Sequence, residues 1–107
     1  MSKIAVTFDN KEYLLEYNRQ SVKTLEAQGF ILSELAEKPA TMIPMLFQGA
    51  FFKNHKGIKR GLVEDIFEEM QDKTGLLEAL VSLYSETLSS LTEDKGDQGN
   101  ASWALMK

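Results

Sequence analysis

The spacing of apolar side chains changes once along this chain, after Tyr17, and that change restricts the fold more than any other feature. Ile4–Phe8 and Tyr13–Tyr17 alternate apolar with small or polar side chains, as strands with one buried face do. Beyond Tyr17 the apolar residues recur every three or four positions, which is typical of amphipathic helices. Strands followed only by helices predict an α+β fold, with an N-terminal β-hairpin and then a bundle of about four helices.

The two predicted strands are joined by a short polar link. We expect a two-residue turn at Asn10 and Lys11. The register that follows pairs Phe8 with Tyr13, Val6 with Leu15 and Ile4 with Tyr17. These apolar side chains then share one face of the hairpin. Because a two-stranded hairpin is marginally stable alone in water, helices or a second copy of the chain must cover that face.

A first helix is predicted between Asn18 and Gly29. Asn18 and Ser21 are both candidate N-caps, and Gly29 can take the left-handed conformation that commonly follows the last helical turn. A further turn from Ser33 must end at Lys38, because the residue before a proline is pushed out of the helical region.

Residues 42–52 form the most apolar segment of the chain. With Thr41 as its N-cap, Pro44 falls at the third helical position, where a missing N–H costs nothing. Apolar side chains cover most of this predicted helix, so it is either the central core helix or a helix with a second face for a partner. The candidate partner-binding residues here are Met42, Met45, Leu46, Phe51 and Phe52.

Two further helices and a polar tail complete the prediction. One amphipathic helix contains Val63–Met70, and after a turn at Asp72–Gly75 another contains Leu77–Leu91. From Thr92 to Ser102 no large apolar side chain occurs, so burial cannot offset the entropy of ordering this segment. We therefore predict a single α+β domain at residues 1–91 and a disordered, flexible polar tail at residues 92–107. Near the end of that tail, Trp103 either packs against the domain or is available to bind a partner.

Composition excludes several kinds of chemistry. The chain has no cysteine, which excludes disulfides, thiolate metal sites and cysteine nucleophiles. Its one histidine, His55, cannot build a multi-histidine metal site, and no glycine-rich phosphate loop occurs. The acidic residues between Glu64 and Glu69 form the polar side of an amphipathic helix. We expect no catalytic residue, no metal site and no cofactor. No long apolar run follows Lys3, so we also expect no signal peptide, no membrane span and an intracellular protein.

A basic link at residues 53–60 leaves one alternative function open. It carries the four cations that could contact a phosphate backbone, Lys53, Lys56, Lys59 and Arg60. Against this interpretation, the chain has 16 acidic and 12 basic residues, and the link contains no aromatic ring for base stacking. A small nucleic-acid-associated phage regulatory protein is therefore the less favoured alternative.

Four stretches of the chain resemble, in order, the small tail assembly chaperones of long-tailed bacteriophages and prophages. They are EYLLEYNRQSVKTLEAQGF, KPATMIPMLFQGAFFKNHKGIKR, GLLEALVSLYSETLSSL and GNASWALMK. The resemblance implies a small, non-enzymatic α+β or mostly helical protein of the host cytoplasm. It also implies that the chaperone binds the long tape measure protein and keeps it soluble while tail tube subunits polymerise around it. The chaperone then leaves, so the mature virion does not contain it.

The same resemblance implies a longer product, made by ribosomal frameshifting near the end of the gene, whose added segment recruits tail tube protein. A chaperone for a long, hydrophobic, helical rod needs adaptable apolar surface and enough like charge to stay soluble. The apolar segment at residues 42–52, Trp103 and a net charge of −4 suit that task. Self-association into a homo-oligomer is a second way to cover the surplus apolar surface.

Overall fold

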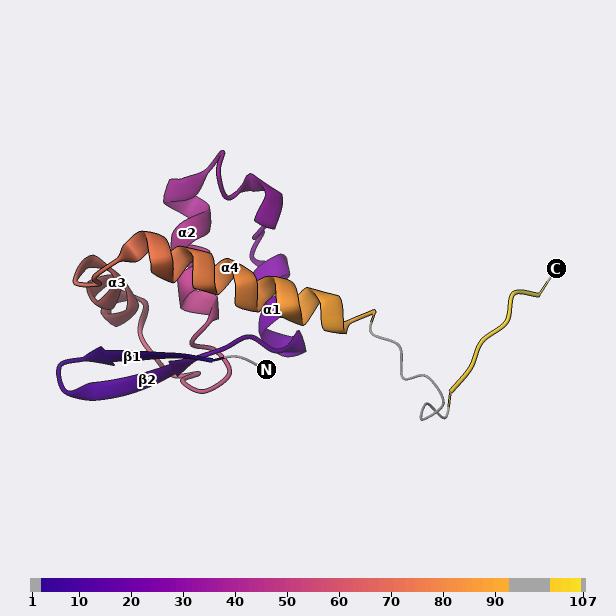
Figure 1. Ribbon diagram of the computed structural model, residues 1–107, viewed down its shortest axis with the longest axis horizontal. Helices are drawn as coiled ribbons and strands as arrows, with labels where there is room; N and C mark the ends of the chain where they lie inside the picture. The colour runs from indigo at the N-terminus through magenta and orange to yellow at the C-terminus, as the bar shows by residue number, and fades with distance from the viewer. Residues whose placement is uncertain (1–2, 93–100, 107) are drawn as a thin grey trace.

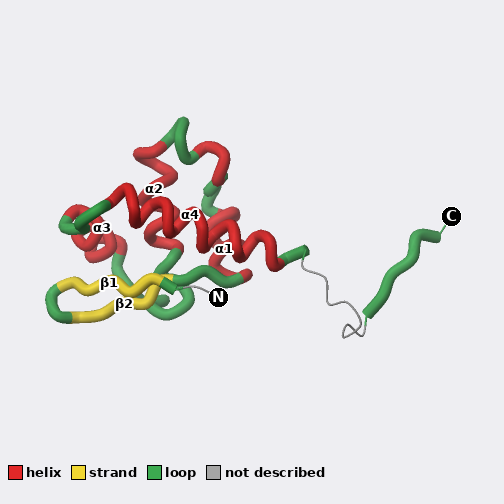
Figure 2. Tube along the Cα trace, in the orientation of Figure 1, coloured by secondary structure: helices red, strands yellow, loops and turns green. Residues whose placement is uncertain are grey.

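The computed structural model describes residues 3–92 and 101–106. Within these residues a β-hairpin comes first and four α-helices follow, as Figures 1 and 2 show. The elements are β1 (Ile4–Phe8), β2 (Lys11–Leu15), α1 (Arg19–Ala27), the 3-10 helix η1 (Leu32–Glu34), α2 (Pro39–Gly49), α3 (Arg60–Glu68) and α4 (Lys73–Ser90). The predicted α+β fold is confirmed. The predicted flexible tail falls mainly on residues 93–100 and 107, which lie outside the described residues.

The hairpin turns one residue earlier than expected. Phe8 lies opposite Lys11, Val6 opposite Tyr13 and Ile4 opposite Leu15. The predicted register is wrong by two residues because Asp9 and Asn10 form the turn, with φ angles of 52° and 62°. Short Asp and Asn side chains adopt positive φ more easily than lysine does. A shift of two residues keeps the same side chains on the core face, although Tyr17 now lies beyond β2.

The turn gives a first prediction. A two-residue turn with positive φ at both positions favours glycine second, so Asn10→Gly is expected to raise the free energy of unfolding by about 0.5 kcal/mol. Asn10→Ala places a Cβ with no compensating polar group at the same φ, and we expect it to lower that free energy instead. Urea unfolding of the three proteins measures both changes. Equal stability of the glycine and alanine variants would contradict this account of the turn.

The helices lie on one side of the hairpin and enclose one core (Figure 1). Helix α4 crosses α1 and α2 and packs against both. The largest fully buried apolar side chains come from β2 and all four helices or the residues just after them: Phe47, Phe51, Leu15, Leu25, Leu46, Ile66 and Leu80. The hydroxyl of Tyr17 donates a hydrogen bond of 2.6 Å to the Leu46 carbonyl, so the segment after β2 is joined to α2 inside this core.

Helix α2 begins earlier than the sequence indicated. Its N-cap is Lys38 and its first residue is Pro39, where a missing N–H has no intrahelical partner to lose. Pro39 thus ends the preceding turn, as predicted, and also starts the next helix. The early start puts Pro44 inside the helix, not at its third position. Because Pro44 has no N–H, the Ala40 carbonyl lacks its usual donor four residues later.

The ends of α1 follow the prediction, and the start of α4 does not. Asn18 and Ser21 cap α1 reciprocally through two hydrogen bonds of 2.8 Å, and Gly29 follows the helix with a φ of 98°. The predicted turn at Asp72–Gly75 is instead the N-cap and first turn of α4, because the Asp72 carboxylate accepts a hydrogen bond from the Gly75 N–H at 3.1 Å.

Within the described ranges, every helix is too short or too polar to cross a lipid bilayer.

Candidate partner-binding surface

The structure separates the candidate partner-binding residues of the apolar segment. Met42, Leu46 and Phe51 are 5%, 0% and 0% exposed, so they belong to the core of this domain. For Met42 and Leu46 the central core helix, one of the two interpretations open from the sequence, is correct. Phe51 lies beyond the end of α2 at Gly49, earlier than the predicted helix end, but it packs in the same core. Met45 and Phe52 are half-buried and line two different surface hollows. A partner can therefore contact only part of the predicted set.

A groove runs between α2 and α3 and reaches the start of α4. It consists of two hollows of about 520 and 450 Å³ that share Ala40, Pro44 and Phe67. The first hollow continues toward Met45 and the second toward Leu77. We call this surface the α2–α3 groove. Its further apolar lining residues are Ile43, Phe47 and Val63.

Phe67 is held in place on the floor of the α2–α3 groove. Its ring packs on the Phe47 ring with centroids 5.2 Å apart, and the Lys73 ammonium lies 5.7 Å from its ring centre. The same ammonium donates to the Glu68 and Met70 carbonyls at 3.1 and 3.3 Å, which fixes its position at the end of α3. The groove therefore has a well-packed apolar floor. Its charged lining residues carry both signs: Arg60, Glu64, Glu68 and Lys73.

Sequence reasoning did not identify Pro44, Phe67 or Leu77 as surface residues of one site. Phe67 and Leu77 fit the apolar stripes of their predicted helices, but both are only half-buried. Pro44 carried a signal, because a proline in the middle of an apolar helix cannot complete the hydrogen-bond ladder. With Thr41 as the expected N-cap, Pro44 falls at the third helical position and gives no such signal, whereas the observed N-cap is Lys38.

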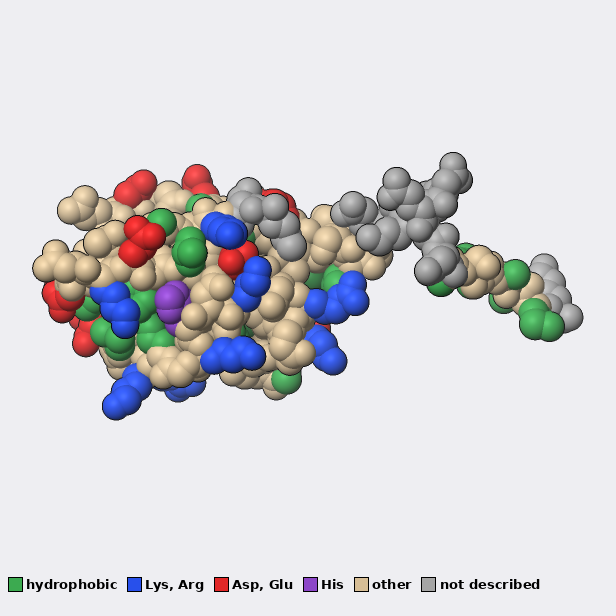
Figure 3. All heavy atoms as spheres, turned by 90° about the horizontal axis from the view of Figure 1, so that it is seen from below, with side chains coloured by type: hydrophobic (Ala, Val, Ile, Leu, Met, Phe, Trp, Pro, Cys, Tyr) green, Lys and Arg blue, Asp and Glu red, His purple; other side chains and the backbone are tan. Residues whose placement is uncertain are grey.

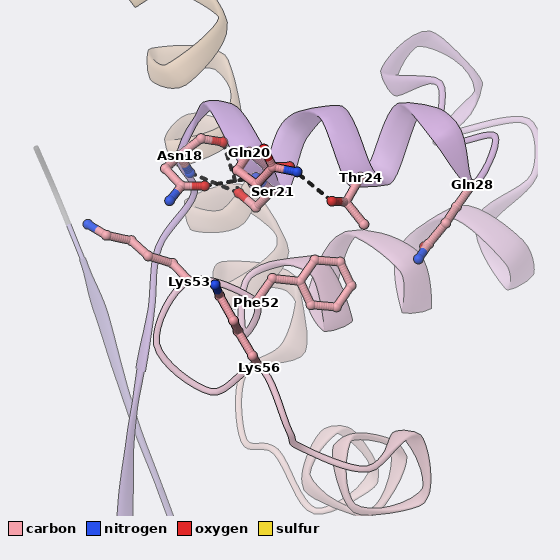
Figure 4. Close-up of a pocket in the computed structure, with 8 residues that line it drawn as sticks. All are labelled: Asn18, Gln20, Ser21, Thr24, Gln28, Phe52, Lys53 and Lys56. Carbon is pink, nitrogen blue, oxygen red and sulfur yellow. Dashed lines mark hydrogen bonds between the residues drawn. The ribbon is translucent and has the colours of Figure 1, made fainter.

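A separate hollow, of about 530 Å³, lies outside the α2–α3 groove, between α1 and the segment that follows α2 (Figure 4). Most of its walls are polar, and several of the polar groups already have partners. Asn18 and Ser21 bond each other, and the Thr24 hydroxyl donates to the Gln20 carbonyl at 3.0 Å. Figure 4 shows the Phe52 ring directed toward α1 and Lys53 extending away from Gln28. The side chains that line this hollow point in different directions and do not converge on one point, as the side chains of a catalytic site do.

Lys53 instead binds a buried carboxylate. Its ammonium lies 3.0 Å from Glu16 Oε1, and the Asn54 amide donates to Glu16 Oε2 at 3.0 Å. The Glu16 side chain is only 7% exposed. The hydrogen bond from Asn54 and then that from Lys53 lower the pKa of Glu16 below its ordinary value of 4.5, because both favour the ionised form. This cluster joins the end of β2 to the segment after α2.

The lowered pKa gives a second prediction. A carboxylate with a depressed pKa stabilises the fold at pH values above 4.5, and this stabilisation is lost as the pH falls through the folded-state pKa. Glu16→Gln is expected to lower the free energy of unfolding by about 1–2 kcal/mol at pH 7 and by much less in acid. Glu12→Gln, at an exposed position of β2, is the control. Equal losses for both variants at every pH would contradict this role of Glu16.

The four cations of the basic link have different surroundings on the described part of the chain. Lys53 contacts Glu16, Lys56 lines the hollow of Figure 4, Lys59 is the N-cap of α3, and Arg60 lines the α2–α3 groove. In Figure 3 the Lys and Arg side chains are scattered across the visible face around the single histidine. The pairing of Lys53 with Glu16 leaves three of the four cations for the nucleic-acid alternative. In the same described part, no three acidic or histidine side chains gather into a cluster that could hold a metal ion.

Trp103 is 88% exposed, and Leu105 and Met106 beside it are similarly exposed. In the described part of the chain, Trp103 is therefore not packed against the domain.

Comparison with known proteins gives one match. A family model described as "Domain of unknown function (DUF5055)" matches residues 1–106. No curated protein and no solved structure matches the chain.

Proposed function

The chain belongs to the DUF5055 family, and we propose that this domain is a non-enzymatic tail assembly chaperone of a long-tailed bacteriophage or prophage. It binds the tape measure protein and keeps it soluble in the host cytoplasm while tail tube subunits polymerise. It leaves before the virion is mature. The sequence resemblance suggests this role, and the observation that carries it is the α2–α3 groove.

The shape of the α2–α3 groove suits an amphipathic helix. Such a helix places its apolar stripe in a groove and its polar flanks on the rim. Pro44, Met45 and Phe67 supply apolar contacts, and charged side chains of both signs surround them. Helix α2 has eleven residues, so a partner helix lying beside it contacts a length of about 16 Å, or three turns. A long helical rod offers many such segments in succession.

Two features of the groove support binding to more than one such segment. The Met45 side chain is unbranched and half-buried, so it can change rotamer to fit partners of different shape. The charged rim keeps the complex hydrated while the apolar floor is covered. Several copies of the chain along one tape measure protein also give the complex a net negative charge, which opposes aggregation.

Tail tube protein is the second proposed partner, recruited through a longer, frameshifted product. Reading the gene for a slippery run near its last codons tests whether that product is encoded. In the chain itself, exposed Trp103 adds an apolar contact outside the groove.

Co-expression with the tape measure protein of the same phage tests the proposed function. We expect the tape measure protein to move from the pellet to the soluble fraction and to copurify with this chain. The control is expression of the tape measure protein with an unrelated acidic protein of similar size. Equal insolubility with and without this chain would contradict the proposal.

A further inference from the structure

The outer edge of β2 is covered at its Leu14 end by groups from the segment after α2. The Leu14 N–H donates to His55 Nε2 at 3.1 Å, and the Leu14 carbonyl accepts from the Asn54 amide at 3.2 Å. Two residues further on, the Glu16 N–H donates to the Ala50 carbonyl at 3.1 Å. These contacts occupy the positions at Leu14 and Glu16 that a third strand would otherwise take beside β2, whereas among the described residues no hydrogen bond reaches the outward groups of Glu12.

Among the residues that the structure describes, none covers the outer edge of β1 in this way. In an antiparallel pair, residues alternate between those that bond across the pair and those whose N–H and C=O point outward. Because Leu14 bonds away from β1, its opposite residue Ala5 also points its N–H and C=O outward, and so does Thr7. Within residues 3–92 and 101–106, no hydrogen bond reaches these groups of Ala5 or Thr7. A short row of donors and acceptors is thus open to another strand.

A hollow of about 340 Å³ adjoins this edge at the Phe8 end of β1. It lies between β1 and the end of α3, and Phe8, Ile66 and Met70 give it apolar walls. Glu69 adds a negative charge to the same hollow. None of the residues that line it also lines the α2–α3 groove. The β1 edge and the groove are therefore separate surfaces.

We propose that the occupant of this edge is β1 of a second copy of the chain, antiparallel and centred on Val6. Ala5 then lies opposite Thr7 of the second copy, so every outward N–H and C=O of these two residues finds a partner in both copies. Ile4 lies opposite Phe8 of the second copy, beside the hollow at the end of α3. Lys3 lies opposite Asp9 of the second copy, which places unlike charges together at both ends of the ladder.

Other registers are poorer by the same criteria. The pairing that centres on Ala5 sets Lys3 opposite Thr7 and leaves Asp9 without its cation. The pairing that centres on Thr7 sets Ala5 opposite Asp9 and leaves Lys3 without its anion. A shift by one residue joins outward groups to residues whose hydrogen bonds are already used in the hairpin. Charge, hydrogen bonding and apolar contact therefore select the register centred on Val6.

Two paired hairpins form a four-stranded sheet whose helices remain attached to each half. Each β1 contributes only five residues, so the contact is small and the dimer depends on protein concentration. Because the α2–α3 groove uses other residues, each copy keeps its groove. The inference is independent of the proposed function and is tested without a tape measure protein.

Sedimentation equilibrium of the purified full chain over a wide range of concentration tests the dimer. We expect a reversible monomer–dimer equilibrium for the natural sequence. Ala5→Pro removes the outward N–H of Ala5, a change that edge strands tolerate, and is expected to weaken association roughly tenfold or more. Ala5→Val keeps the N–H and serves as the control. Circular dichroism and thermal unfolding show whether each variant keeps its fold.

Lys3→Asp provides a second test that leaves the strand backbone intact. It sets two carboxylates opposite each other at each end of the ladder, and is expected to weaken association roughly threefold to tenfold at low salt. Lys23→Asp, the same change at an exposed position of α1, is its control and should leave association unchanged. A monomer at every concentration, or a dimer equally strong in the Ala5→Pro and Lys3→Asp variants, would overturn the proposal.

Discussion

Replacing Pro44 by glutamate is expected to abolish the solubilising effect on the tape measure protein without unfolding the domain. Pro44 is exposed and belongs to both hollows of the α2–α3 groove, so a carboxylate there charges the centre of the apolar floor. Glutamate also restores an N–H that can bond the Ala40 carbonyl. Removing proline from the helix interior stabilises the fold, and the greater freedom of the unfolded chain offsets part of this gain. The free energy of unfolding is therefore expected to rise by about 1–2 kcal/mol.

Co-expression and thermal unfolding together measure both effects of this variant. Ala36→Glu adds the same charge at an exposed position outside the groove, and should solubilise the tape measure protein as the natural chain does. Pro44→Ala restores the helix without the charge, so it should gain stability and keep part of the effect. Full solubilisation by a folded Pro44→Glu variant would show that the α2–α3 groove is not the binding surface.

The period of the apolar side chains was sufficient to predict the element order. Alternation over Ile4–Phe8 matches β1 in full, and the caps at Asn18 and Gly29 match the ends of α1. These features are local, because a strand period or a cap depends on residues within a few positions of one another. Local rules were also enough to predict the face of the hairpin that is buried, since a register error of two residues leaves that face unchanged.

The errors arose where two local rules competed or where contacts were distant in sequence. Pro39 can end one turn or begin a helix, and only the packing of α2 against its neighbours shows that it does both. The contact of Phe67 with Phe47 joins residues on different helices, so no single-helix pattern distinguishes a groove floor from a core position. For the same reason the Lys53–Glu16 ion pair could not be predicted, because the sequence around each residue gives no sign of its partner.

Replacing Gly49 by valine is expected to lower the free energy of unfolding by about 3 kcal/mol or more. Gly49 is the last residue of α2, and a Cβ built on it would lie 2.6–2.8 Å from three side-chain carbons of Leu25 on α1. Leu25 is completely buried in the core, so a movement of its side chain also disturbs the side chains packed around it. Overpacked cores must shift side chains or backbone, and a branched side chain makes the necessary shift larger.

Gly61→Val is the matched control for this prediction. Apart from its chain neighbours and the adjacent backbone of α3, nothing that the structure describes lies within 4 Å of a Cβ at Gly61, which is exposed near the start of that helix. Because glycine is also a poor helix former, this change should leave stability unchanged or slightly raise it. Leu25→Ala removes the atoms that a Gly49 side chain would meet. If close packing is the cause, the loss in the Leu25→Ala, Gly49→Val double variant is smaller than the sum of the single losses. Additive losses would show instead that Gly49 matters for a backbone reason, and that α1 and α2 owe their close approach to other contacts.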